Sequence, residues 1–479
     1  MLRQVLLSLA ILPISLSTDA QQSPLKPCRL PGVDEQLLCG KLSVFENRQT
    51  RSGRKIELNV VVLPSLDQRN KEAPLFDLAG GPGVASTSAA RLYSTELRDY
   101  RRHRDVVLVD QRGTGASNPL QCKEGEPHYL REMYPVRYVE DCRRKLERVA
   151  DLTQYTTPIA MDDLDDVRAW LGYERINLIG LSYGTRAALV YLRQHLERVR
   201  SVVLMGLAPT NARLPMYHTR NGQRAMELLV AECAADVACH KEYPRLREEF
   251  SELLKTLERK PVRTRYKPAT AATEIEVQIR RDQFAEELRS QLYAPPVARR
   301  VPFIIHQAAR GNFEPFLKVA IPDDPSTKVA NIIADGMYLS VTCAEDVPFI
   351  DIAAAERMNR DTFFGNYRVT QQVRACAHWP QGSVPAGYDK PVEATAPVLI
   401  IAGYMDPVTA PDWASEAASH LPNSKLWIIR NHAHLPVGLT NFGCFDGVIM
   451  KFLDQPDVNK LDTSCGEQML PPPFFIEKH

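Results

Sequence analysis

The interpretation of this sequence starts from INLIGLSYGTRAALVYL, residues 176–192. INLI is a short apolar run of the kind that forms a strand buried on both faces, and TRAALVYL opens a helix directly after Gly184. Between them, residues 180–184 (the serine turn) match G-x-S-x-G. In a strand–turn–helix setting this turn is too tight for side chains at its glycines, and it lifts the serine hydroxyl to the carboxyl end of a sheet. We therefore predict Ser182 as a nucleophile; a glycine-rich turn with a capping serine is the alternative.

A catalytic serine needs an imidazole to take its proton and a carboxylate to orient that imidazole. With this type of serine turn, the carboxylate and then the histidine follow the serine along the chain, each after a late strand. The run 398–402 leads into Asp406, which we predict as the acid; an aspartate that caps a turn before proline is the alternative. The run 426–429 leads into Asn-His-Ala-His, where we predict His434 as the base and keep His432 as the runner-up.

The oxyanion of an acyl-transfer intermediate needs backbone N–H donors. One donor normally comes from the residue after the nucleophile, here Tyr183, and the other from a loop after an early strand. The chain has Gly-Gly-Pro-Gly at residues 80–83 (the glycine loop) directly after the apolar run 76–78. We predict Gly81 and Tyr183 as the oxyanion hole, with a simple surface turn as the alternative for the loop.

The order of strands and helices indicates the fold class. Buried strands are expected at 76–78, 106–110, 176–179, 202–205, 398–402 and 426–429, with helices at 162–171, capped by Asp162, and at 183–199. Such alternation is typical of a mostly parallel sheet covered on both sides. Residues of about 211–390 instead carry charge-rich helical patterns such as 244–259, with little strand signal beyond 274–279. We therefore predict an α/β fold whose core, 21–210 and 391–479, is interrupted by a mainly helical cap at 211–390.

The amino terminus predicts export. Residues 1–20 combine a positive start, a twelve-residue apolar run and a small-residue exit at Ala20, which is typical of a signal peptide. A membrane anchor is the alternative, but the run is too short for a bilayer and Pro13 interrupts it. We expect a secreted or periplasmic protein that does not insert into a membrane after cleavage.

Ten cysteines fit an oxidising compartment. Along the chain they form five pairs of neighbours, and pairing each cysteine with its neighbour would close five modest loops. Connectivity is not fixed by sequence, and buried reduced thiols are the alternative. The predicted pairs are Cys28–Cys39, Cys122–Cys142, Cys233–Cys239, Cys343–Cys376 and Cys444–Cys465.

Composition excludes several classes of function. Hydrophobic residues at 44% and charged residues at 24% are ordinary for a globular protein and exclude wholesale disorder. The 59 basic and 58 acidic residues give a net charge of +1, so there is no electrostatic reason to bind nucleic acid or an anionic membrane. A metal site at His432-x-His434 is weak because no carboxylate or third histidine lies close in sequence. We expect no metal and no cofactor.

Five segments, in this order, resemble one family. They are the glycine loop, DQRGTGAS at 110–117, GLSYGTR at 180–186, GYMDPVT at 403–409 and the late histidine. Together they resemble the α/β-hydrolase peptidases over nearly all of the mature chain, above all the proline iminopeptidases and the exported tripeptidyl-aminopeptidase-like enzymes. One residue departs from the pattern: Ala79 stands where proline iminopeptidases usually have histidine, which puts narrow proline specificity in doubt. We expect Asp110 and Arg112, with the glycines beside them, to shape a loop under the serine turn.

The resemblance extends into the cap. LSVTCAED at 339–346 and CAHWP at 376–380 look like the exported branch of this family. Its relatives that cleave from the amino terminus hold the substrate ammonium with acidic cap residues, which implies Glu345 and Asp346 as ligands here. A solvated acidic pair beside a disulfide is the alternative.

The leading interpretation is an exported serine aminopeptidase that acts on peptides with a free N-terminus. A carboxylic-ester hydrolase is the runner-up, because the same triad serves either acyl group. A non-catalytic binding protein on a hydrolase scaffold ranks lower, since such proteins usually lose a triad member and all three are present here.

Overall fold

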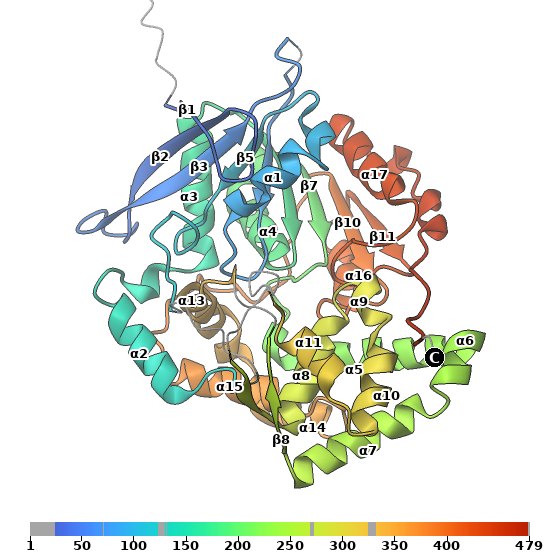
Figure 1. Cartoon of the computed structure of the whole chain (residues 1–479). Coiled ribbons are helices and arrows are strands. Elements are labelled where there is room, and N and C mark those ends of the chain that lie inside the picture. The colour runs from blue at the N-terminus through green and yellow to red at the C-terminus, as the bar shows by residue number, and fades with distance from the viewer. Residues whose placement is uncertain are drawn as a thin grey trace, which may run out of the picture.

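The computed structural model describes residues 24–69, 71–122, 130, 132–268, 273–323 and 332–477. The predicted signal peptide lies outside these residues. Within them, the centre of the fold is a nine-stranded sheet in the order β1-β2-β3-β5-β4-β6-β7-β10-β11 (Figure 1). Its strands are β1 Lys26–Cys28, β2 Leu37–Phe45, β3 Lys55–Leu63, β4 Leu75–Leu78, β5 Val106–Val109, β6 Ile176–Leu181, β7 Val199–Met205, β10 Val398–Gly403 and β11 Ser424–Ile429.

The six strands from β5 to β11 in this order run parallel to their neighbours. They are the six strands that the continuous apolar runs predicted, and that prediction is confirmed. The sequence prediction missed β1, β2 and β3, which extend one edge in antiparallel pairing. In β3 the first residues alternate between exposed and buried, but residues 60–63 (VVVL) form a continuous buried apolar run that the sequence prediction overlooked.

Helices cover the sheet. The helices along the core are α1 Ala90–Ser94, α2 Val136–Leu146, α3 Thr157–Trp170, α4 Tyr183–His195, α16 Pro411–Ser419 and α17 Phe442–Asp454. The predicted start of α3 at Asp162 is wrong, because the helix already begins at Thr157 with Pro158 in its first turn, where a proline costs no hydrogen bond. Asp162 instead accepts a hydrogen bond from Gln194 Nε2 at 2.9 Å. The helix predicted at 183–199 ends earlier, because β7 begins at Val199.

The chain leaves the sheet after Met205 and returns at Val398. Between these points the helices gather below the sheet in Figure 1, together with the hairpin of β8 Val262–Tyr266 and β9 Ile275–Ile279. The helices are α5 Leu214–Ala235, α6 Val237–Glu242, α7 Leu246–Arg259, α8 Arg281–Gln291, α9 Pro295–Ala298, α10 Val301–Ala309, α11 Glu314–Ala320, α13 Asp335–Glu345, α14 Ile352–Asn359 and α15 Tyr367–Cys376. The helix predicted at 244–259 and the strand at 274–279 are present as α7 and β9.

The helices of the cap pack into two different apolar clusters. Helices α7, α8 and α11 bury Phe250, Phe284 and Phe316 in an apolar cluster separate from those of the sheet. Helix α13 instead buries Met337 and Leu339 in the cluster that covers one face of the sheet. Helix α13 is therefore continuous with the core, while the first half of the segment between β7 and β10 has a core of its own. The boundaries at 211 and 390 stay predictions.

All five predicted disulfides are present, and the described part of the chain contains no free cysteine. Cys343–Cys376 joins α13 to α15 within the cap, and Cys444–Cys465 joins α17 to the C-terminal segment. Within the described ranges, no helix is long and apolar enough to cross a membrane.

Candidate active site

The serine turn has the strained geometry that its sequence predicts. Ser182 adopts φ 58° and ψ −123°, a region that a residue with a side chain rarely occupies. A Cβ on Gly180 would lie 2.4 Å from Gly184 O, and one on Gly184 would lie 1.9 Å from Leu78 O. Only glycine fits at these two positions. The turn therefore presents a half-buried Ser182 at the carboxyl end of β6, immediately before α4.

Asp406 and His434 meet although 28 residues separate them. His434 Nδ1 lies 2.8 Å from Asp406 Oδ2, and both side chains are almost fully buried. Asp406 also accepts hydrogen bonds from the N–H groups of Val408 and Thr409, at 2.7 and 2.8 Å, and from the Thr409 hydroxyl at 2.8 Å. Burial raises the pKa of Asp406, but the charge of His434 and these hydrogen bonds outweigh it and hold the pKa below its ordinary value. The carboxylate is thus ionised and fixed toward the imidazole.

His432 has different surroundings. Its Nδ1 faces the backbone oxygen of Ala433, its Nε2 is buried without a partner, and its ring stacks on Phe445. Burial lowers the pKa of His432 to about 4, so it is neutral at pH 7. Of the two histidines, it is His434 that bonds to Asp406.

The serine and the histidine both lie beside the carboxyl end of β7. The N–H of Ser182 donates to Met205 O at 2.9 Å, and a Cβ on the next residue, Gly206, would lie 3.2 Å from His434 Cε1 and Nδ1. The structure thus brings all three predicted triad residues to the carboxyl ends of β6, β7 and β10. Within the described residues, no hydrogen bond joins Ser182 Oγ to the imidazole, and the roles of the three residues stay predictions.

The glycine loop packs against the serine turn. A Cβ on Gly80 would lie 3.3 Å from Ser182 Cβ, and Gly81 has φ 112°, which favours glycine. Gly83 O accepts a hydrogen bond from the N–H of Ala334 at 3.0 Å, so the loop is held from the cap side. The predicted donor Gly81 directly follows Gly80, the residue that contacts the nucleophile, while its role in an oxyanion hole remains a prediction.

The loop that begins at Asp110 organises the backbone around the glycine loop. Asp110 is fully buried and accepts hydrogen bonds from the N–H and hydroxyl of Thr87 and from the N–H of Ala116. The Arg112 guanidinium is also buried and pairs with Asp163 through Nε at 2.6 Å and Nη2 at 2.9 Å. Both side chains are thus occupied by protein groups, in agreement with the expected shaping of a loop.

Glu345 and Asp346 lie at the end of α13, and both are almost fully buried. Glu345 accepts hydrogen bonds from the N–H and hydroxyl of Thr157, at 2.6 and 2.8 Å, and from the Tyr388 hydroxyl. Asp346 forms an ion pair with Arg186 of α4 at 2.9 Å. Burial raises the pKa of Glu345, and the charge of Arg186 and these hydrogen bonds only partly offset it. The predicted ammonium ligands therefore have protein partners, and the alternative of a solvated acidic pair does not fit their burial.

The network around Glu345 reaches the serine turn. The Thr157 hydroxyl that donates to Glu345 also lies 2.8 Å from the hydroxyl of Tyr183, the residue after the nucleophile. Sequence reasoning did not find Thr157. Arg186 was visible as a charge inside the buried helix that follows the serine turn, but its partner lies 160 residues away.

The cap contacts both the acid and the base loop. Asn221 Nδ2 of α5 donates to Val408 O, and the N–H of Leu435 donates to Tyr293 O at 2.8 Å. The Tyr293 ring lies edge-on to His434, with the ring centroids 5.1 Å apart. These cap residues carry no motif, and sequence reasoning did not identify them.

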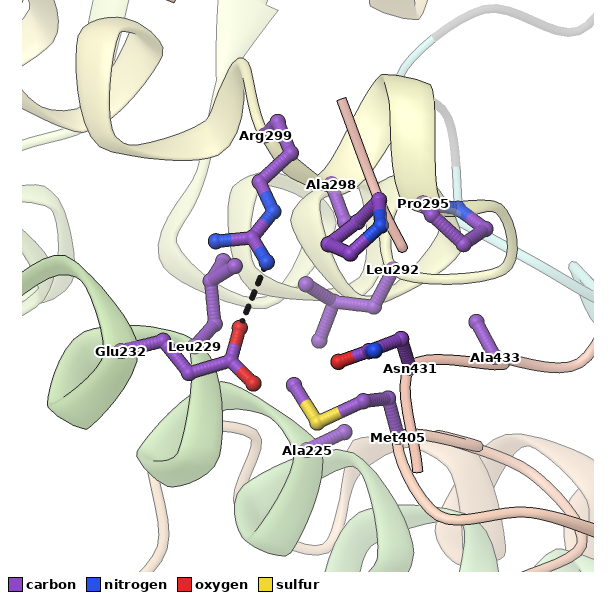
Figure 2. A pocket seen from close by; sticks show the side chains of 11 residues that line it. Ala225, Leu229, Glu232, Leu292, Pro295, Ala298, Arg299, Met405, Asn431 and Ala433 are labelled. Carbon is purple, nitrogen blue, oxygen red and sulfur yellow. Dashed lines mark ion pairs between the residues drawn. The ribbon is translucent and has the colours of Figure 1, made fainter. Parts of the chain in front are cut away.

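A pocket opens where α5 and α9 approach these loops (Figure 2). Met405 and Ala433, which precede the acid and the base, form part of its wall, together with Leu229 and Leu292 from the cap. An ion pair between Arg299 and Glu232, 2.9 Å long, lies at one side of it. The pocket marks an incompletely filled seam between cap and core beside the triad. Among the described residues, no group of three or more His, Cys, Asp or Glu side chains is arranged to hold a metal ion.

The sequence matches one family model and is similar to several proteins of known name, three of which are described here. A family model described as alpha/beta hydrolase fold matches residues 78–438. The tripeptidyl aminopeptidase of Streptomyces coelicolor is 23% identical over 482 residues, which cover 92% of this chain and 85% of that protein. The serine protease Hip1 of Mycobacterium tuberculosis is 28% identical over 239 residues, 44% of this chain and 45% of Hip1. The proline iminopeptidase of Neisseria gonorrhoeae is 28% identical over 134 residues, 28% of this chain and 32% of that enzyme.

These findings confirm the predicted fold and the predicted resemblance to peptidases of this fold. The alignment with Hip1 spans less than half of that protein's length, whereas the alignment with the tripeptidyl aminopeptidase runs through the cap as well as the core. Together with the serine turn, the names of these relatives support a serine hydrolase.

Proposed function

Because this chain belongs to the alpha/beta hydrolase family, we propose that it is an exported serine aminopeptidase that cleaves peptides near a free N-terminus. The observation that carries the proposal is the convergence of a strained Ser182 with the Asp406–His434 pair at one edge of the sheet. The five disulfides and the predicted signal peptide support export.

The proposed reaction proceeds through an acyl-enzyme. His434 takes the proton of the Ser182 hydroxyl as its oxygen attacks the scissile carbonyl, and Asp406 stabilises the imidazolium that forms. The N–H groups of Gly81 and Tyr183 bind the oxyanion, and His434 then protonates the leaving amine. Water attacks the ester in the second half, with His434 again acting as the base. The hydrogen bonds that fix Asp406 keep the imidazole in the tautomer this sequence of steps requires.

The restriction to free N-termini is supported by the cap and by the relatives. Two of them carry aminopeptidase or iminopeptidase in their names, and one of these aligns over 92% of this chain. We assign the ammonium of the substrate to the carboxylates of Glu345 and Asp346. These two carboxylates share one buried arginine, Arg186, so the group has an excess of negative charge when both are ionised.

The test compares kcat/KM for a short peptide amide and for its N-acetylated twin. Acetylation removes the ammonium and its hydrogen bonds to a carboxylate, so we expect the blocked peptide to react at least about tenfold more slowly. Glu345→Gln or Asp346→Asn should raise KM for the free peptide while leaving the hydrolysis of a small aryl ester nearly unchanged. Equal rates on both peptides would remove the aminopeptidase assignment, and efficient turnover of esters alone would favour the carboxylic-ester hydrolase.

A further inference from the structure

A second, largely buried charge cluster lies in the cap near His434, with Arg289 buried and its two partners partly buried. It consists of Glu286 and Arg289 on α8 and Arg368 on α15, and we call it the arginine cluster. Arg289 Nη2 and Arg368 Nη1 both donate to Glu286 Oε1, at 2.6 and 2.7 Å, and Arg289 Nε donates to Glu286 Oε2 at 3.0 Å. Two guanidinium groups thus surround one carboxylate, and the cluster has an excess of positive charge.

Glu286 does not neutralise the cluster. Burial raises the pKa of Glu286, but the two arginines outweigh it and lower the pKa to about 2. The carboxylate is therefore ionised at any physiological pH, yet it can compensate only one of the two arginines. Because both of its oxygens already accept arginine N–H groups, it is also poorly placed to bind an ammonium.

The cluster keeps donors that no protein group in the described part of the chain accepts. Arg289 is only 2% exposed, and its Nη1 has no hydrogen-bond partner. Arg368 Nε is likewise buried and unpartnered, while its Nη2 donates to the Tyr338 hydroxyl at 3.1 Å. A buried charged donor without an acceptor costs free energy, so such a group binds a ligand, an ion or an ordered water.

The position of these donors is fixed. A Cβ on Gly222 of α5 would lie 2.8 Å from Arg289 Cγ and Cδ, so the arginine stem runs tightly along α5. The Arg289 guanidinium lies 5.6 Å from the centroid of the Tyr293 ring, and that ring lies 5.1 Å from the ring of His434. One aromatic side chain therefore separates the cluster from the predicted base.

His218 lies close enough to both the arginine cluster and His434 for their charges to act on its pKa. His218 of α5 is 6% exposed, and its Nδ1 is buried without a partner. Burial lowers its pKa well below the ordinary value, and the charges of Arg368, Arg289 and His434 lower it further.

We propose that Arg289 and Arg368 bind a carboxylate of the substrate next to the scissile bond. This inference rests on the proposed peptidase function and names its substrate class as short peptides with an anionic group. The unpartnered N–H groups of two arginines match the two oxygens of a carboxylate, which a guanidinium binds more strongly than it binds a neutral amide. Two sources have this chemistry: the C-terminal carboxylate of a short peptide, and the side chain of an aspartate or glutamate.

Two substrate series distinguish these sources. The first compares an alanine tetrapeptide that ends in a free carboxylate with its C-terminal amide. The second uses the C-terminal amide throughout and replaces one alanine at a time; at each position it compares the peptide with glutamate and the peptide with glutamine. Products are quantified by mass spectrometry, and the measured quantity is the ratio of kcat/KM for the acid to that for the neutral twin. We expect a ratio of about ten or more in one series, and that series identifies the source.

Variants at the cluster should move this ratio in opposite directions. Arg289→Gln and Arg368→Gln should each lower it about tenfold, whereas Glu286→Gln should raise it by removing the competing carboxylate. A merely structural role would reduce all rates together and would not give opposite signs. Arg247→Gln is the matched control, because Arg247 pairs with Glu227 on the exposed side of the cap and should leave the ratio unchanged.

A second readout does not depend on peptide cleavage. N-acetylalanine should inhibit hydrolysis of a small aryl ester, N-acetylalaninamide should inhibit at least about tenfold more weakly, and Arg289→Gln should abolish the difference. Ratios near one in both peptide series, with neutral peptides still cleaved, would overturn the carboxylate site and leave the peptidase. Selective inhibition of ester hydrolysis without any peptide cleavage would overturn the peptidase and leave the site.

Discussion

Asp406 in the core is fully buried and Glu286 in the cap is partly buried, and both carboxylates have a lowered pKa, but different kinds of partner hold them. Asp406 is bound by two N–H groups and a hydroxyl from residues two or three positions along the chain, and by His434. Glu286 is bound only by arginine side chains, one of them 82 residues away. The core therefore fixes its charge by local backbone geometry, and the cap by side chains that come from two different helices. This difference suits chemistry in the core and recognition in the cap.

The largest effect that tests this division is on the rate. Ser182→Ala and His434→Ala should each lower kcat by about 10⁴–10⁶, because the triad acts as a unit. Cap variants such as Arg289→Gln should change selectivity by about tenfold only. The measurement is steady-state kinetics on a neutral peptide, with labelling of Ser182 by a fluorophosphonate.

His432→Ala is the control for the base, since His432 does not contact Asp406 and substantial activity should remain. If His432→Ala were as inactive as Ser182→Ala while His434→Ala kept its activity, the role of base would belong to His432.

The next effect is on stability, at the ion pair that joins core helix α4 to the cap. Asp346→Asn leaves the buried Arg186 without its carboxylate, so we expect the free energy of unfolding to fall by about 3–5 kcal/mol. Chemical denaturation followed by circular dichroism measures this.

Glu197→Gln breaks an exposed pair with Arg198 near the end of the same helix and should cost less than about 1 kcal/mol. An equally small loss in Asp346→Asn would show that the two regions are not held together by this pair.

The smallest effect is on the pH dependence of the free energy of unfolding, which should have opposite signs at two carboxylates. Burial raises the pKa of Asp77 in β4 to about 6, although the hydrogen bond from Tyr93 acts in the opposite direction. The contribution of Asp77 to the free energy of unfolding therefore falls as pH rises from about 4 to about 6. The pKa of Glu286 is lowered to about 2, so its contribution is complete above about 4.5 and is lost on acidification. At about 1.4 kcal/mol for each pKa unit, either effect amounts to at most about 3 kcal/mol.

The test subtracts the unfolding free energies of Asp77→Asn and of Glu286→Gln from that of the wild type at several pH values. The first difference should decrease between pH 4 and 6, and the second should decrease below pH 4.5. Slopes of the same sign would contradict the opposite pKa shifts of Asp77 in the core and Glu286 in the cap.

The sequence predicted the core site well because parallel strands carry their ends to one edge of the sheet. Ser182, Asp406 and His434 each follow an apolar run, so their proximity could be inferred from order alone. The antiparallel strand β2 was missed because its half-buried face leaves no long apolar run, whereas the buried run at residues 60–63 of β3 was overlooked.

The cap offered no such rule. Glu286 and Arg289 are three residues apart on one helix, and their pairing could be anticipated locally. The approach of Arg368 depends on how α15 packs against α8, which no spacing in the sequence encodes. The same holds for Arg186 and Asp346, whose encounter depends on the return of α13 to the core.

The hydrogen bonds from Asn221 to Val408 and from Leu435 to Tyr293 have a consequence for engineering. Through them the cap supplies part of the scaffold of the acid and the base loop, so it is not an exchangeable module. A chimaera that received a relative's whole cap would lose the Asn221 side-chain bond unless an equivalent amide replaced it, and would keep the backbone bond of Leu435 only if the new loop followed the path of Tyr293. A graft that retains residues 217–225 and 292–297 and exchanges only the more distant helices would preserve the geometry of the triad.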